Sequence, residues 1–239
     1  MKSSLSLWAA RTICTALLAI TLPALAATPD FSGKWLSEST QNQLLTSDGK
    51  LPPLLPAAKE TLATHQASAK ANNFNFDPVS HCLPPGVPRL NSNAQPFLIL
   101  QRPNRVLMVY QFQRLVRQIY MLGTQPENPD PAFLGNSVAH WQDDTLVIES
   151  NGFKSAGLLD NVGTPYSKAL QITERWRLRD ANTLQAVVDI NDASNFSAPW
   201  QVTYLFRKQT GTELTEDTCA DRTWPKRLEQ QKRMETAAQ

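Results

Sequence analysis

The chain has 239 residues, 41% of them hydrophobic and 18% charged, which is enough for one domain with a real core and excludes wholesale disorder. Residues 1–26 hold Lys2 and Arg11; without them the 23 Lys and Arg fall to 21 and balance the 21 Asp and Glu. Nucleic acids and anionic membrane surfaces favour a basic excess, so neither is an expected partner.

Residues 1–26 have the pattern of a secretory signal peptide. Basic residues precede an apolar run over 12–22, and Ala24-Leu25-Ala26 supplies the small-x-small motif of a cleavage site. The run is well short of the ~20 residues that span a bilayer, so no membrane span is expected. We predict cleavage after Ala26, with Ala27 as the alternative, and a mature periplasmic protein in which 27–239 form one domain.

The mature chain opens with a Gly-x-Trp pattern. Gly33 and Trp35 lie in the first expected strand, which covers residues 31–36. This pattern resembles the opening of lipocalin-like barrels, in which the Trp closes one barrel end and the Gly allows close approach of the backbone. The pattern favours a barrel once further hairpins follow it.

Residues 38–95 differ from the rest of the chain. They contain a set of prolines and no run of alternating β-branched residues: Pro52, Pro53, Pro56, Pro78, Pro84, Pro85 and Pro88. Good helix formers over 54–71, with Pro56 suited to a first turn, predict one helix there. We expect a proline-rich excursion with a single helix.

From Pro96 onward the pattern changes to strand, turn, strand. The expected strands cover 97–100, 106–110, 115–121, 137–142, 145–150, the two arms of a hairpin within 170–190, and 200–208. With the first strand, about eight or nine antiparallel strands without intervening helices indicate a closed barrel or a sandwich. The Gly-x-Trp opening favours the former, an all-β, up-and-down, lipocalin-like barrel around a small apolar cavity.

Matching apolar faces across the turns sets the register of two hairpins. The Asp143-Asp144 turn pairs Trp141 with Leu146 and makes His140 and Glu149 diagonal neighbours on the opposite face. A three-residue loop over 180–182 pairs Glu174 with Val188, on the apolar side of its strand. A carboxylate there must be paired or must have a raised pKa.

The cysteines and histidines of the chain indicate whether a metal site is expected. Cys14 lies in the leader, so Cys82 and Cys219 remain, and an even pair in an oxidising compartment favours a disulfide, with two free thiols as the alternative. His65, His81 and His140 lack zinc-site spacing, and no dinucleotide or nucleophile-elbow motif occurs. We therefore expect no metal and no cofactor.

Several motifs resemble a large family of secreted, mostly uncharacterised bacterial proteins. They have the forms CxPPGxPR (82–89), GxSxxHW (135–141) and DTLV (144–147), and the resemblance covers roughly 77–219. It implies a Cys82–Cys219 disulfide but no agreed chemistry. The chain departs from the family pattern at four positions, which leaves either lost or altered chemistry open: Leu122, Thr124, Asn136 and Tyr166.

The candidate site combines acid–base groups with apolar wall. Glu174 is a candidate proton donor and His140, near Glu149, a candidate general base, with Tyr120 as a hydroxyl partner. The structural alternatives are a half-buried strand histidine and a buried ion pair of Glu174 with Arg89 or Arg117. The candidate ligand-binding residues are Trp35, Arg89, Arg117, Trp141, Tyr166 and Trp176.

Two principal functions follow. One is a cofactor-free lyase, hydratase or isomerase step on an apolar ring-containing or terpenoid-like compound. The other is a non-catalytic carrier or binding module for such a molecule; a structural envelope protein is a third. An enzyme needs at least two titratable groups that converge on the ligand, whereas a carrier needs only apolar lining. No pattern in the sequence indicates an oligomeric state.

Overall fold

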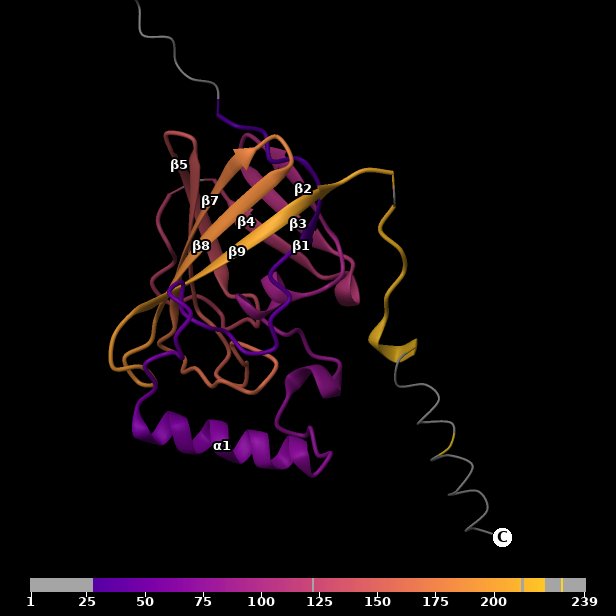
Figure 1. Ribbon diagram of the computed structural model, residues 1–239. Helices are drawn as coiled ribbons and strands as arrows, with labels where there is room; N and C mark the ends of the chain where they lie inside the picture. The colour runs from indigo at the N-terminus through magenta and orange to yellow at the C-terminus, as the bar shows by residue number, and fades with distance from the viewer. Residues whose placement is uncertain (1–27, 122, 212, 222–228, 230–239) are drawn as a thin grey trace, which may run out of the picture.

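The computed structural model describes residues 28–121, 123–211, 213–221 and 229. The predicted signal peptide, its cleavage site and Leu122 lie outside these residues. Nine strands form a closed barrel in which each strand pairs with its neighbour in sequence and the last pairs with the first (Figure 1). The strands are β1 Gly33–Ser37, β2 Phe97–Arg102, β3 Arg105–Tyr110, β4 Val116–Tyr120, β5 Asn136–Gln142, β6 Thr145–Asn151, β7 Gln171–Asp180, β8 Thr183–Asn191 and β9 Trp200–Gln209. The predicted all-β, lipocalin-like barrel is confirmed.

The two hairpin registers predicted from apolar matching are also confirmed. Trp141 pairs with Leu146 across the β5–β6 turn, and Glu174 pairs with Val188 between β7 and β8. The β7–β8 hairpin has one irregularity near its tip, where Asp180 rather than Arg179 pairs with Thr183. Register is well specified here because a slip of one residue would turn the whole apolar face outward.

One junction departs from the antiparallel plan. β4 and β5 run parallel and pair only at Ile119 with Ser137 and at Tyr120 with Val138. Parallel neighbours cannot be joined by a tight hairpin, because the chain must first return to the other end of the sheet. The segment that makes this return includes residues 123–135, and three prolines within them (Pro126, Pro129 and Pro131) disfavour a further strand. The β4–β5 seam is therefore the shortest ladder in the barrel.

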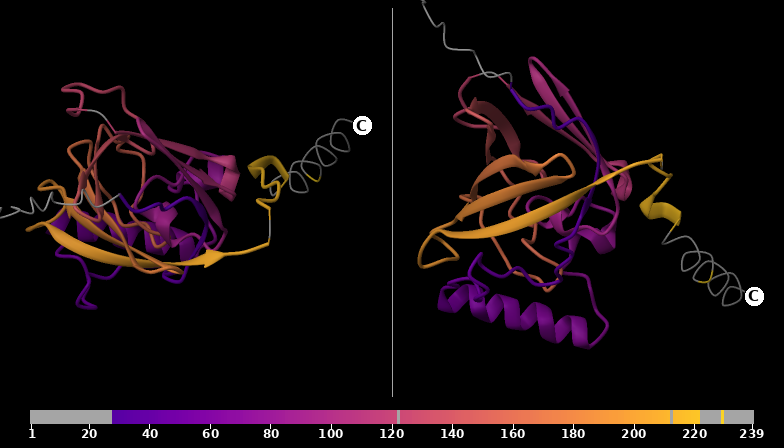
Figure 2. Two further views of the ribbon diagram at one scale, coloured as in Figure 1. Left: turned by 90° about the horizontal axis from the view of Figure 1, so that it is seen from above. Right: turned by 45° about the horizontal axis from the view of Figure 1, so that its top comes forward.

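The proline-rich excursion contains the predicted helix. Helix α1 covers Pro56–Lys70, begins at the predicted proline, and lies across one end of the barrel (Figures 1 and 2). It buries Ala58 and Leu62, and His65 Nδ1 is 2.7 Å from the carbonyl oxygen of Gly163. Short 3₁₀ turns follow at Pro78–His81 and Arg89–Ser92, and a third, Phe112–Arg114, lies between β3 and β4. Among the helices that the structure describes, none is long and apolar enough to cross a membrane.

Aromatic side chains fill much of the barrel interior. Trp176 stacks on Phe206 with ring centroids 5.0 Å apart, and Phe97 meets both rings edge-on. Trp35 is fully buried, and its indole N–H donates to the carbonyl oxygen of Phe31 at 2.9 Å. A Cβ at Gly33 would lie 3.3 Å from Cε of Lys208, which is part of a flexible side chain and not of the backbone. The interior is thus largely core.

A disulfide links the excursion to the segment after β9. Cys82 and Cys219 are joined across 137 residues of sequence, as predicted. In Figure 2 the segment after β9 (yellow) leaves the barrel wall. The disulfide therefore ties a loop at one end of the fold to a segment that the β-ladder does not hold.

Candidate functional site at the β4–β5 seam

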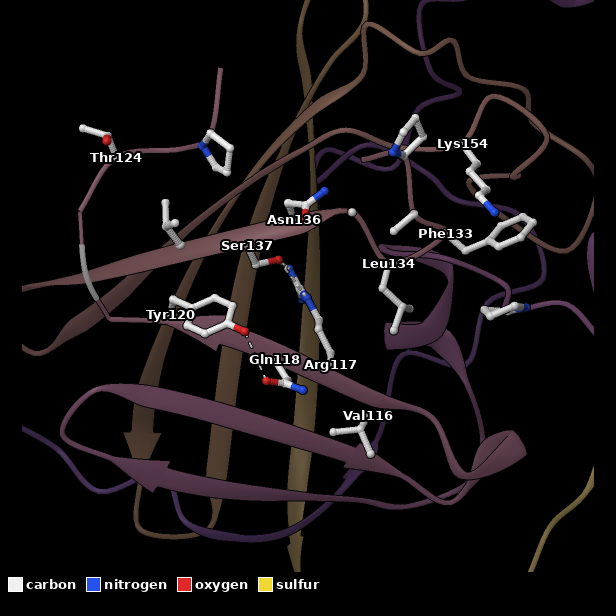
Figure 3. Close-up of a pocket in the computed structure, with 16 residues that line it drawn as sticks. Val116, Arg117, Gln118, Tyr120, Thr124, Phe133, Leu134, Asn136, Ser137 and Lys154 are labelled. Carbon is white, nitrogen blue, oxygen red and sulfur yellow. Dashed lines mark hydrogen bonds between the residues drawn. The ribbon is translucent and has the colours of Figure 1, made fainter. Parts of the chain in front are cut away.

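An open cleft lies at the seam between β4 and β5. We call it the seam cleft, and its volume is about 750 Å³ (Figure 3). Its lining comes from β4, β5 and the loop between them, with Pro84 and Lys154 at the edges: Val116, Arg117, Gln118, Tyr120, Thr124, Pro126, Pro131, Ala132, Phe133, Leu134, Gly135, Asn136, Ser137 and Val138. A volume of this size suits a small organic ligand.

The cleft follows from the short parallel ladder. β4 and β5 pair at only two positions, and residues 131–135 of the connecting loop line the cleft beside them. Gly135 immediately precedes β5 and has φ +66°, and a Cβ there would lie 2.6 Å from the Phe153 ring. Only glycine combines this backbone conformation with such close packing. The glycine of the GxSxxHW motif therefore brings the loop that carries Phe133 and Leu134 to the cleft.

An ion pair lies beneath the cleft floor, inside the barrel. Arg117 is 1% exposed and Glu174 is 0% exposed, and Arg117 Nη2 donates to Glu174 Oε2. Asn91 Nδ2 donates to the other carboxylate oxygen at 3.2 Å. The sequence left open whether Glu174 pairs with Arg89 or Arg117, and the structure shows Arg117. The carboxylate on the apolar face is paired, one of the two outcomes that its position required.

Arg117 also bridges the seam with hydrogen bonds. Its Nε and Nη2 donate to Ser137 Oγ at 3.3 and 3.2 Å, and Nη2 donates to Ser150 Oγ at 3.0 Å. The two serine hydroxyls lie 2.9 Å apart. One side chain on β4 therefore reaches β5, β6 and, through Glu174, β7. It connects strands where the backbone ladder is short.

The electrostatics of this cluster keep Arg117 cationic. Burial alone would lower the pKa of Arg117, but the Glu174 carboxylate outweighs it and the pKa is raised. Burial also raises the pKa of the Tyr110 phenol, an effect that the Arg117 charge opposes and Glu174 reinforces. The Tyr110 side chain in turn contributes to raising the pKa of Arg117, so the two buried groups interact. The buried ion pair of Arg117 and Glu174 is therefore intact.

The proposed acid–base residues do not converge. Tyr120 lines the cleft, is 53% exposed, and donates to Gln118 Oε1 at 3.3 Å. His140 and Glu149 are exposed on the outer surface of β5 and β6, whereas Glu174 is enclosed on the inner side. The barrel wall separates the histidine from the buried carboxylate. His140 and Glu174 therefore do not share one acid–base site.

The proposed ligand-binding residues are dispersed, and of these six Arg117 is the one that lines the seam cleft. Arg89 instead forms a bidentate ion pair with Asp77, at 2.8 and 2.7 Å. Trp35 and Trp176 are core, and buried Tyr166 packs edge-on against Phe153 at 6.1 Å. Trp141 packs against Phe31 beside a separate hollow.

Several cleft residues were not predicted from the sequence. Phe133 and Leu134 lie in a proline-rich loop with no strand periodicity, and Lys154 follows β6 by three residues. A usable signal was present on β4, where Val116 and Tyr120 face outward and are 47% and 53% exposed. Two of the positions that depart from the resembled family pattern, Thr124 and Asn136, also line the cleft.

Within the described residues no group of three His, Cys, Asp or Glu side chains could hold a metal ion. Comparison with protein-family models and with curated proteins gives no match to this chain. The functional assignment therefore rests on the geometry of the seam cleft.

Proposed function

We propose that the protein binds a small, largely apolar, ring-containing molecule in the seam cleft. The observation that carries this proposal is an open cleft of about 750 Å³ whose walls are mainly apolar: Val116, Tyr120, Phe133, Leu134, Pro126 and Pro131. Covering such a wall releases about 25 cal/mol for each Å² of apolar surface removed from water. An aromatic or alicyclic ring would gain the most from the flat faces of Tyr120 and Phe133.

The geometry supports a carrier or binding module better than an enzyme. Both oxygens of the Glu174 carboxylate accept hydrogen bonds from protein groups, so neither is left to move a proton. His140 and Glu149 lie on the outer surface of the barrel. The cleft therefore lacks two converging acid–base groups among the residues described for it, which general acid–base catalysis requires.

We also propose that the protein works in the periplasm. The leader over residues 1–26 and the Cys82–Cys219 disulfide support this location, because disulfides persist in oxidising compartments. The motif resemblance to secreted bacterial proteins agrees with it. A ligand bound there would be one that enters or leaves through the cell envelope.

The neutral fluorescent probe N-phenyl-1-naphthylamine tests binding directly. We expect saturable fluorescence enhancement with the wild type, and about tenfold weaker binding to Val116→Asp, because a carboxylate on the cleft wall must be desolvated when the probe binds. Phe74→Asp is the matched control, since Phe74 is also 47% exposed and lies outside the cleft. Absence of saturable binding, or equal losses in both variants, would contradict the proposal.

A further inference from the structure

All charged side chains that line the seam cleft are basic. The lining includes Arg117 and Lys154 and contains no Asp or Glu. This is a local feature, because the chain without residues 1–26 has 21 basic and 21 acidic residues. A ligand in the cleft therefore meets a potential that the overall charge of the protein does not provide.

The two cations differ in what they offer a ligand. Arg117 is neutralised by Glu174 beneath the floor and donates to Ser137 and Ser150, so it offers a ligand no net charge. Lys154 forms no ion pair with any residue that the structure describes. Its ammonium is exposed to water, so an anion could reach it without the large desolvation cost of a buried pair.

Lys154 is also held at the cleft by its surroundings. Its backbone N–H donates to the carbonyl oxygen of Ala132 at 3.1 Å, and the neighbouring Phe153 forms a parallel bridge with Ala132. Its Nζ lies 5.2 Å from the centroid of the Phe133 ring, a cation–π distance. Figure 3 shows Lys154 beside Phe133, at the opposite side of the cleft from Tyr120 and Thr124. The positive charge thus lies next to an apolar wall.

We infer that the ligand is an amphipathic organic anion, a ring-containing acid whose carboxylate or sulfonate pairs with Lys154 while its apolar body covers the cleft wall. This inference rests on the proposed function, since it names the chemical class bound at the same cleft. The anion remains at the rim, in contact with water.

Two probes with the same ring skeleton test the inference. The neutral probe is N-phenyl-1-naphthylamine, and its anionic counterpart is 8-anilinonaphthalene-1-sulfonate, which adds one sulfonate. We expect the wild type to bind the anionic probe about five- to tenfold more tightly, a preference that declines with added salt because exposed charges are screened. Lys154→Gln should abolish this preference, so that the two probes bind with similar affinity, whereas Lys154→Arg should retain it.

Lys168→Gln is the matched control. Lys168 is exposed, lies outside the cleft, and its replacement removes the same charge. A preference that is absent in the wild type, survives Lys154→Gln, or is lost equally in Lys168→Gln would overturn the inference. Each of these results is compatible with saturable binding of the neutral probe that Val116→Asp weakens, so the proposed function can stand when this inference fails. Failure of the neutral probe itself would count against the proposed function.

Discussion

Replacing Glu174 with Gln removes one negative charge from the barrel interior and keeps the shape of the side chain. Glu174 is fully buried and accepts from Arg117 on one oxygen and from Asn91 on the other. An amide has one oxygen, so one of these two donors would face an NH₂ group. The guanidinium of Arg117 would also remain buried without its counter-charge. Breaking a buried pair in this way costs about 3–5 kcal/mol.

For a domain of this size such a loss lowers the melting temperature by about 6–20 °C, because each kcal/mol corresponds to about 2–4 °C. Urea unfolding followed by circular dichroism should show the loss, while the affinity for the neutral probe stays within about twofold. The double variant Arg117→Met/Glu174→Leu should recover most of the stability, since an apolar pair replaces the ions. A loss below about 1 kcal/mol in Glu174→Gln would refute the assignment of this pair as a structural bridge.

Three other perturbations give separate tests. Replacing Cys82 and Cys219 with Ser should lower the unfolding free energy by about 4 kcal/mol, because the unfolded chain regains the conformational entropy that the long cross-linked loop had lost. Two alkylatable thiols in the unreduced, denatured wild type would contradict the disulfide. Gly135→Ala should lower the free energy of unfolding, measured in urea, by about 2–4 kcal/mol, because φ is +66° and the new Cβ would lie 2.6 Å from Phe153. Gly49→Ala is the control, with φ +81° and open space around it, and should cost only about 1 kcal/mol. Equal losses in the two variants would exclude the packing explanation. Burial raises the pKa of Tyr166 above 10.0, so the phenol loses its proton at a lower pH in the unfolded chain than in the folded one. The stability that the neutral phenol confers should therefore be complete below pH 10 and fall as the pH rises above it. Tyr166→Phe should reduce this alkaline loss, measured as the difference in unfolding free energy between pH 9 and pH 11; an unchanged difference would argue against the burial of the hydroxyl.

The sequence specified interactions between adjacent strands better than interactions across the barrel. The pairings of Trp141 with Leu146 and of Glu174 with Val188 follow from short turns and matching apolar faces, both of which are local. The partner of Glu174 did not follow, because β4 and β7 are not adjacent and their side chains meet only through barrel closure. Arg89 and Arg117 were equally plausible until the excursion placed Asp77 beside Arg89.

The seam cleft was harder to predict for a different reason. The strand pattern of β4 and β5 is clear in the sequence, but their relative direction depends on the path of residues 121–135, which have no periodicity. Prolines there show that the segment is not a strand without showing where it goes. Phe133, Leu134 and Lys154 therefore came together only in the structure, even though Val116 and Tyr120 already pointed to an apolar outer surface.

The location of the cleft follows from how the barrel is filled. Trp35, Trp176 and Phe206 occupy the interior, so a ligand is better accommodated at a gap in the wall than along the barrel axis. A gap weakens the ladder, and the Arg117 side chain compensates by connecting Ser137, Ser150 and Glu174 across the strands. Arg117 thereby holds the wall together beneath the cleft. Because Glu174 neutralises Arg117, Arg117→Met with Glu174→Leu should preserve the fold and also the preference for the anionic probe, which Lys154→Gln removes. Loss of the preference in this double variant would show that Arg117, and not Lys154 alone, attracts the anion.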